Sequence, residues 1–246
     1  MKDSLVIANN WAALRAFTPA RIALGRAGSG LPTTELLRFG LAHAHARDAV
    51  HAALDAEALA AKLRELGLSP RIVKSAAPDR ATYLRRPDLG RRLAPDSAIS
   101  KSEHPYALAI EDGLSALAVE RHAMPLVRAL IALAPQRWAR ASVAIALQGR
   151  VALGDEIGAA FGAQLVVVLI GERPGLSSPD SLGAYLTFAP RLGRTDAERN
   201  CVSNIRPEGL GYEAAARRID WIAAAGVARG VTGVGLKDDS GGWCRG

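Results

Sequence analysis

Cysteine is scarce in this chain of 246 residues, which contains only Cys201 and Cys244. Two cysteines cannot build the disulfide framework of a small secreted protein or a zinc site made of cysteine pairs. Cys244 lies in a Gly-rich tail, where we expect an inert thiol, whereas Cys201 begins the segment CVSNI. Cross-links and cysteine-based metal sites are therefore excluded as organising features of the fold.

Long apolar runs are missing as well. No run approaches the ~20 residues that a transmembrane helix needs. The N-terminal stretch carries Asn9, Asn10 and Arg15 where a secretory signal needs an uninterrupted apolar core. We therefore expect an intracellular, cytoplasmic protein with no membrane partner.

Acidic residues are outnumbered, because 31 lysines and arginines face 24 aspartates and glutamates, for a formal net charge of +7. Nucleic-acid-binding proteins gather such charge on one patch, but these arginines are spread along the chain. The only dense group is Arg85, Arg86, Arg91 and Arg92. We expect no nucleic-acid partner. The charge equally suits an acidic partner or a cofactor phosphate, so a non-catalytic basic α/β interaction module stays open as an alternative.

Nucleotide-binding and metal-binding motifs are also missing. Residues 25–30 have the glycine separation of a P-loop, but Leu31 and Pro32 stand where lysine and serine or threonine must follow. No turn carries the G-x-G-x-x-G fingerprint, so NAD binding is not indicated. His43 and His45 are two residues apart on a predicted helix and point to different faces, which argues against a metal site.

The G-x-S-x-G elbow of α/β-hydrolases is absent too. Serines cluster at positions 177, 178 and 181, but no histidine lies near them in sequence. A hydrolase built on this loop therefore depends on a remote histidine, His104 or His122.

What the chain does contain is an alternation of apolar strands and helices. Residues 106–110, 142–147 and 166–170 are aliphatic runs of strand length, with helical patterns between them. Because strand–helix–strand crossovers are right-handed, this order predicts a parallel sheet. Further strands are predicted at 184–188 and 201–205, before a closing helix at 212–226. The predicted fold class is α/β, a Rossmann-like, mostly parallel sheet with a small helical N-terminal domain.

The remaining segments are divided around this sheet. Helical patterns precede it at about 35–50 and 55–66, and the Arg-rich residues 70–103 are interpreted as an ordered surface connection. Pro125 is predicted to begin a second helical piece. We therefore divide the chain into an N-terminal arm and helical domain (1–75), a Rossmann-like domain (76–236) and a disordered tail (237–246).

Polar turns follow three of the predicted strands. Asp112 and Gly113 follow the first strand, residues 149–151 the second, and Gly171 and Glu172 the third. In open α/β sheets, ligands bind outside the carboxyl ends of the strands. The sequence therefore predicts a loop-built cleft at this edge.

Several segments carry a resemblance to a known family. They are RIALGRAGSGLPTTELL, YLRRPDLGRRL, EDGLSALAV, GRVALGDEIG, VVVLIGERPGLSSPDSLGAY and RTDAERNCVSNIRPEG, and they span about residues 20–236. GERPGL followed by C-x-SNI is a specific combination. On these segments the chain resembles the small (light) subunit of ethanolamine ammonia-lyase. Its N-terminal arm is shorter than in the family, and its tail after Leu236 departs from the pattern.

The resemblance implies an ammonia-lyase that is active only as a complex with a large subunit. In this family the large subunit is a TIM barrel that holds ethanolamine and the adenosyl group, and the small subunit covers the opposite side of the corrin. Adenosylcobalamin, with its cobalt, carries the radical chemistry that yields acetaldehyde and ammonia. The resemblance further implies a hetero-oligomer with about six copies of each chain, cytoplasmic or held in a bacterial microcompartment.

Three positions match the cofactor contacts of the family's small subunit. They are Val151 within GRVALGDEIG, Glu172 within GERPG and Cys201 within CVSNI. Val151 can offer an apolar or backbone contact, Glu172 can accept a hydrogen bond, and Cys201 is small enough to let backbone approach a ligand. Arg150 and Arg173 are weaker candidates for a cofactor phosphate. The resemblance implies no catalytic residue and no metal ligand in this chain.

Overall fold

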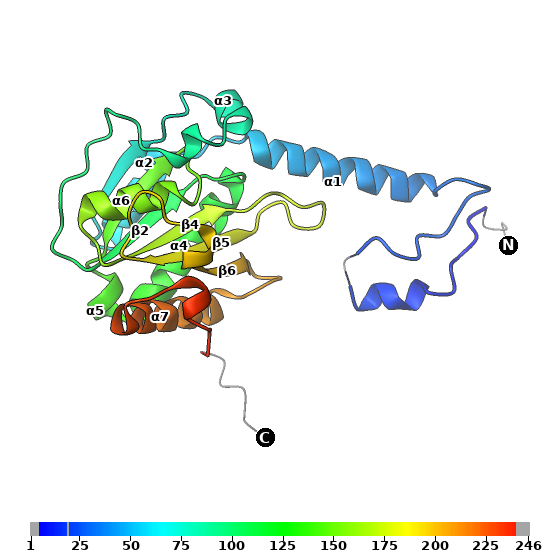
Figure 1. The fold of residues 1–246 in the computed structure, drawn as a ribbon. Coiled ribbons are helices and arrows are strands. Elements are labelled where there is room, and N and C mark those ends of the chain that lie inside the picture. Colours follow the sequence, from blue (N-terminus) through cyan, green and yellow to red (C-terminus); the bar gives the residue numbers. More distant parts are fainter. Residues whose placement is uncertain (1–4, 19, 240–246) are drawn as a thin grey trace, which may run out of the picture.

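Within residues 5–18 and 20–239, the strands form one mixed sheet of six strands in the order β1-β3-β2-β4-β5-β6 (Figure 1). The computed structural model describes residues 5–18 and 20–239. β1, β3, β2 and β4 pair in parallel, whereas β5 and β6 join antiparallel at one edge. The strands are β1 (Pro70–Lys74), β2 (Tyr106–Glu111), β3 (Ser142–Leu147), β4 (Leu165–Gly171), β5 (Leu182–Phe188) and β6 (Arg199–Ile205). The predicted α/β fold with a mostly parallel sheet is confirmed.

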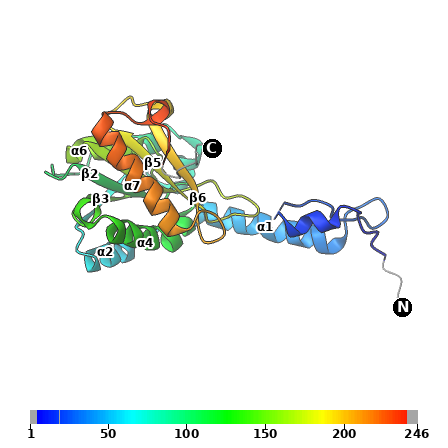
Figure 2. The same ribbon diagram turned by 90° about the horizontal axis from the view of Figure 1, so that it is seen from below.

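Helices cover the two faces of the sheet unequally. On one face, α2 (Ala56–Glu65), α4 (Ala116–Leu133) and α7 (Tyr212–Arg229) pack on a large apolar core (Figure 2). On the other, α6 (Leu153–Phe161) packs against β2 and β4. Every residue of β2 and β4 is buried, as expected of central parallel strands. Short helices complete the fold, namely α3 (Arg80–Arg85), α5 (Pro135–Trp138), η2 (Leu89–Arg91), η3 (Asp196–Glu198) and η4 (Gly233–Gly235).

Two details of the predicted secondary structure are wrong. Residues 70–74 form edge strand β1, not part of a surface connection. The segment looked polar because Arg71 and Lys74 face solvent while Val73 is buried. Pro125 lies inside α4 and does not begin a helix. α4 continues through it because Leu126, Val127 and Leu130 are fully buried, and their burial offsets the hydrogen bond that proline removes.

The N-terminal part of the chain projects from this body. η1 (Ala12–Ala16) and α1 (Thr33–His51) extend away from the sheet, with the residues before α1 running back along it (Figures 1 and 2). The predicted division at residue 75 stays a prediction. We propose to place it near residue 52, because α2 and β1 pack on the sheet. Most of the predicted tail, residues 240–246 with Cys244, lies outside the described residues.

Candidate functional site

The carboxyl ends of β2, β3 and β4 meet at one edge of the sheet, as the sequence predicted. Asp112, just after β2, accepts hydrogen bonds from the backbone N–H groups of Gln148 (2.9 Å) and Gly149 (3.0 Å) after β3. Burial raises the pKa of this carboxyl, while those two N–H groups oppose the shift. A single buried carboxylate thereby holds two strand tips together.

The loops after β2 and β4 approach so closely that they require glycine. Gly113 has a φ of +58°, and a Cβ there would lie 2.3 Å from the carbonyl oxygen of Gly171. A Cβ on Gly171 would lie 2.0 Å from the carbonyl oxygen of Ser115. The backbone N–H of Leu114 donates to Gly171 across this crossing (2.9 Å). Backbone contacts of this kind leave no room for side chains.

A cleft of about 370 Å³ opens above these tips. Val151 and Glu172 both line it, together with Tyr185 of β5. A larger cleft of about 800 Å³ adjoins it and shares Arg150, Val151 and Tyr185 with it. The open face of the antiparallel strands and the start of α6 therefore border a continuous concave surface. Its other lining residues include Tyr83, Leu114, Ile170, Arg173, Arg91, Leu192 and Thr195.

The Glu172 carboxylate is held by its own chain. The Ser181 hydroxyl donates to one of its oxygens. The backbone N–H of Asn204 lies 3.4 Å from both oxygens. The carboxylate also lies over Gly183, where a Cβ would come within 3.0 Å of Oε1. Glu172 thus joins the tip of β4 to the bulged end of the β5–β6 pair, and it keeps lone pairs for a further donor.

Cys201 lies beside the cleft without lining it. It pairs with Tyr185 across β5 and β6, and its thiol hydrogen-bonds the Tyr185 side chain. Desolvation raises the pKa of the thiol, and the nearby Glu172 carboxylate raises it further. The thiol is therefore not activated as a nucleophile. The structure brings the three predicted residues to one region, with Tyr185 between Cys201 and the cleft; their cofactor role stays a prediction.

The part of the cleft wall formed by Tyr83 was not predicted from the sequence. Tyr83 of α3 donates its hydroxyl to the Gly149 carbonyl (3.0 Å). The Arg150 guanidinium stacks on the Tyr83 ring at 4.5 Å, and its Nη2 donates to the Tyr83 carbonyl (3.1 Å). The Arg150 backbone N–H donates to Gly90 (2.9 Å). The motif YLRRPDLG therefore folds against the β3 tip. Tyr83 and Gly90 stand out as non-charged residues within an Arg-rich stretch, and this was the available sign that the segment packs against the fold.

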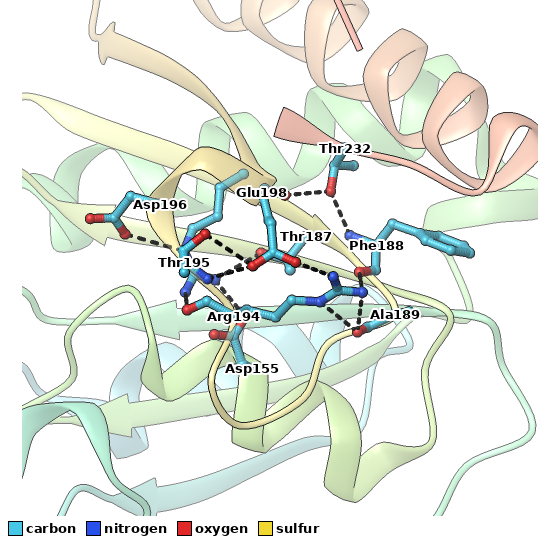
Figure 3. Close-up of polar contacts among 10 residues, drawn as sticks. Asp155, Thr187, Phe188, Ala189, Arg194, Thr195, Asp196, Glu198 and Thr232 are labelled. Atoms are coloured by element: carbon cyan, nitrogen blue, oxygen red, sulfur yellow. Dashed lines mark hydrogen bonds and ion pairs between the residues drawn. The ribbon is translucent and has the colours of Figure 1, made fainter. Parts of the chain in front are cut away.

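A buried ion pair between Asp155 and Arg199 belongs to the lining of the larger cleft. Figure 3 shows the polar contacts in this region. The side chain of Arg199 is 2% exposed, and its Nη1 lies 2.6 Å from Asp155 Oδ1 and 3.1 Å from Thr187 Oγ1. Arg199 Nη2 donates to the Arg194 carbonyl (2.8 Å), and Arg194 donates to the Phe188 carbonyl (3.0 Å). These bonds connect β5 and β6 with the start of α6.

Glu111 is an unusual buried acid beneath the same edge. It is fully buried, and neither carboxyl oxygen has a hydrogen-bond partner within the described residues. Desolvation raises its pKa well above the ordinary value, and the charges of Asp112 and Asp155 act in the same direction. Burial therefore favours the neutral form of this carboxyl over the charged form. Across residues 5–18 and 20–239, no three side chains that can ligate a metal ion lie together.

These features define the structural class of the protein. The molecule is an α/β protein with an open binding cleft at the strand tips, and that cleft is lined by arginine, carboxylate and apolar side chains. Within the part of the chain that the structure describes, no helix is both long enough and apolar enough to span a bilayer.

The comparisons with known proteins then give the family. A family model described as ethanolamine ammonia-lyase light chain (EutC) matches residues 8–237. A protein of Bradyrhizobium diazoefficiens named ethanolamine ammonia-lyase small subunit is 57% identical over 234 residues, covering 92% of this chain and 90% of the relative. One of the same name from Azotobacter vinelandii is 54% identical over 241 residues, covering 94% and 89%. The chain belongs to the ethanolamine ammonia-lyase light-chain family, and the predicted family is confirmed.

Proposed function

We propose that this chain is the small subunit of an ethanolamine ammonia-lyase. Together with a large subunit it converts ethanolamine to acetaldehyde and ammonia, with adenosylcobalamin as the cofactor. The observation that carries this proposal is the family match over residues 8–237, with relatives of that name above half identity.

The strand-tip cleft is suited to one side of a corrin. The rim of a corrin carries amide groups, which need both donors and acceptors. The cleft has an acceptor in Glu172, and it has one buried polar atom without a hydrogen-bond partner within the described residues, Arg150 Nε. Unpaired buried polar atoms are costly unless a ligand or water satisfies them. The residues present therefore fit the group.

Each predicted residue has a defined part in this proposal. Val151, two residues before α6, gives an apolar and backbone contact. Glu172 accepts a hydrogen bond from an amide or hydroxyl group. Cys201 provides a small side chain beside Tyr185. Arg150 and Arg173 face the cleft as cations for a phosphate. Adenosylcobalamin, when bound, supplies the radical that starts the reaction. This chain binds and orients the group and keeps water from one side of it, and it supplies no general acid or base.

The alternatives have less support. In the Arg-rich segment, Arg86 pairs with Asp88 (2.7 Å) and Arg92 pairs with Glu156 (2.5 Å). These two carboxylates neutralise two of the four clustered arginines, so the cluster is a weaker candidate for binding an anionic partner. A serine hydrolase needs a histidine beside its nucleophile, but the Ser181 hydroxyl donates to Glu172.

Location and assembly belong to the same proposal. We infer a cytoplasmic complex of about six copies of each chain, which a bacterial microcompartment can enclose. Neither nucleic acid nor a membrane is a partner in this proposal.

Reconstitution tests the proposed function. The chain is purified, mixed with the large subunit from the same genome and with adenosylcobalamin, and assayed for acetaldehyde. Activity is expected only when all three components are present. A small subunit from the Bradyrhizobium relative serves as the positive control. If that control activates the large subunit and this chain does not, or if this chain turns over ethanolamine alone, the proposal is wrong.

A further inference from the structure

The N-terminal arm, defined here as the described residues between 5 and 51, has almost no core of its own. Pro32 and Ala49 are the only described residues in this range that are buried. Of the fifteen large apolar side chains that are exposed in the described part of the chain, eleven belong to the arm. They include Trp11 (68% exposed), Leu37 (68%) and Leu41 (58%).

Helix α1 is poorly supported as an isolated element in water. It has 19 residues and buries only Ala49, although helices of this length depend on packing an apolar face. One ion pair connects the preceding residues with the helix: Glu35 Oε1 lies 3.5 Å from Arg15, and it also lies 2.8 Å from Arg38 within α1. Such exposed pairs contribute little stability. A concentration of exposed large apolar side chains in one segment is typical of a protein-binding site.

The arm leaves the body at the same edge as the cleft. Arg80 Nε donates to the carbonyl of Val50 near the end of α1 (2.7 Å), and its Nη1 donates to Gly113 at the β2 tip (2.8 Å). Arg21 Nη2 donates to the Leu176 carbonyl in the loop that follows Glu172 (3.2 Å). In Figure 1, α1 and the β4–β5 loop extend in the same direction. A polypeptide that closes the cleft therefore reaches the arm as well.

Charge favours a different chain over a second copy of this one. The described residues of the arm contain five arginines but only Glu35 and Asp48 as acids, an excess of three positive charges. Two such arms facing each other would bring like charges together, which is unfavourable at an interface. A partner with an acidic rim around an apolar centre matches the arm better.

We propose that the apolar surface of the N-terminal arm docks on the large subunit of the lyase. This inference rests on the proposed function and adds to it the surface that joins the two chains. The apolar side chains of the arm become buried on assembly, and the same partner closes the strand-tip cleft.

Paired leucine substitutions test the docking surface. Leu37 and Leu41 lie one turn apart on the same face of α1, and alanine at both positions removes apolar area while favouring the helix. Val234→Ala is the matched control, because Val234 is an exposed apolar residue (84%) on η4. The dissociation constant of the small and large subunits is measured with purified full-length chains. We expect it to rise about tenfold or more for L37A/L41A and to stay within about twofold for V234A.

Several outcomes overturn the inference while leaving the proposed function intact. Unchanged pairing of L37A/L41A with the large subunit is one. Another is a chain that self-associates through these leucines, seen by sedimentation as a dimer that the double variant loses while large-subunit pairing persists. Circular dichroism of the isolated variants confirms that α1 is retained. Failure of the unmodified chain to pair with the large subunit would instead count against the proposed function.

Discussion

At the scale of single residues, Glu172 combines an internal and a proposed external role. Its carboxylate accepts from Ser181 and from the Asn204 backbone, which stabilises the turn after β4. The same group lines the cleft. Because the internal bonds leave acceptor capacity unused, the two roles can be separated by substitution.

Glu172→Ala is expected to weaken cobalamin binding to the two-subunit complex by about tenfold, the effect of one lost charge-assisted hydrogen bond. The loss of folding stability should be smaller, about 1 kcal/mol. Cofactor titration by absorption and urea unfolding measure the two effects. Ser181→Ala, which removes an internal donor but keeps the carboxylate, is the control and should leave cofactor affinity near that of the unmodified chain. Identical titration curves for E172A and the unmodified chain would remove Glu172 from the cofactor site.

Glu111 gives a prediction about pH. Its folded-state pKa is raised above the ordinary 4.5, mainly by desolvation, so the folded chain keeps a proton that the unfolded chain releases. This site therefore lowers stability progressively as the pH rises above about 4.5. Glu111→Gln keeps the shape and removes the titration. We expect the variant to gain stability over the unmodified chain, on the order of 1 kcal/mol at neutral pH, and the gain to vanish near pH 4.5. Unfolding free energies that differ by a constant amount across this range would refute it.

At the scale of elements, the Arg199–Asp155 pair connects β6 with α6 inside the fold. Both side chains are almost fully buried, at 2% and 3% exposed. Removing one partner from a buried pair leaves an uncompensated charge and typically costs about 3–5 kcal/mol. Replacing both with apolar residues costs much less.

Arg199→Met is therefore expected to destabilise the chain by about 3 kcal/mol, and Arg199→Met combined with Asp155→Leu by clearly less. Chemical unfolding of the single and double variants measures this coupling. If the losses in unfolding free energy from the two single substitutions simply add in the double variant, the pair does not connect the two elements.

The elements that the sequence predicted well are those with a strong apolar pattern. The aliphatic runs of β2, β3 and β4 mark buried parallel strands, and the turns after them mark the cleft. β1 was missed because an edge strand buries only part of its residues. The role of Tyr83 and Gly90 was missed because it depends on contacts with Gly149 and Arg150, about 60 residues further along the chain. Local pattern carries no information about such pairings.

Site residues follow the same division. Val151 and Glu172 come directly after strand ends, so their place at the cleft could be predicted from strand positions together with the family motifs. Tyr185 could not, because residue alternation along β5 shows which residues share a face but not which face stays uncovered. Which face stays uncovered depends on the position of α6, which packs on β2 and β4.

At the scale of the whole molecule, this chain has two exposed surfaces that we propose a partner covers, and both lie near the strand-tip edge of the sheet. The cleft at the strand tips is open, and the N-terminal arm exposes apolar side chains. Both are accounted for if a large subunit covers this side of the molecule with the cofactor between the chains.

A structure of the two-subunit complex with bound cobalamin, determined by electron cryomicroscopy, tests this account most directly. The account predicts the corrin against the strand-tip cleft, in contact with Val151 and Glu172, with the large subunit on its other side. A corrin bound away from the tips of β3 and β4 would contradict it.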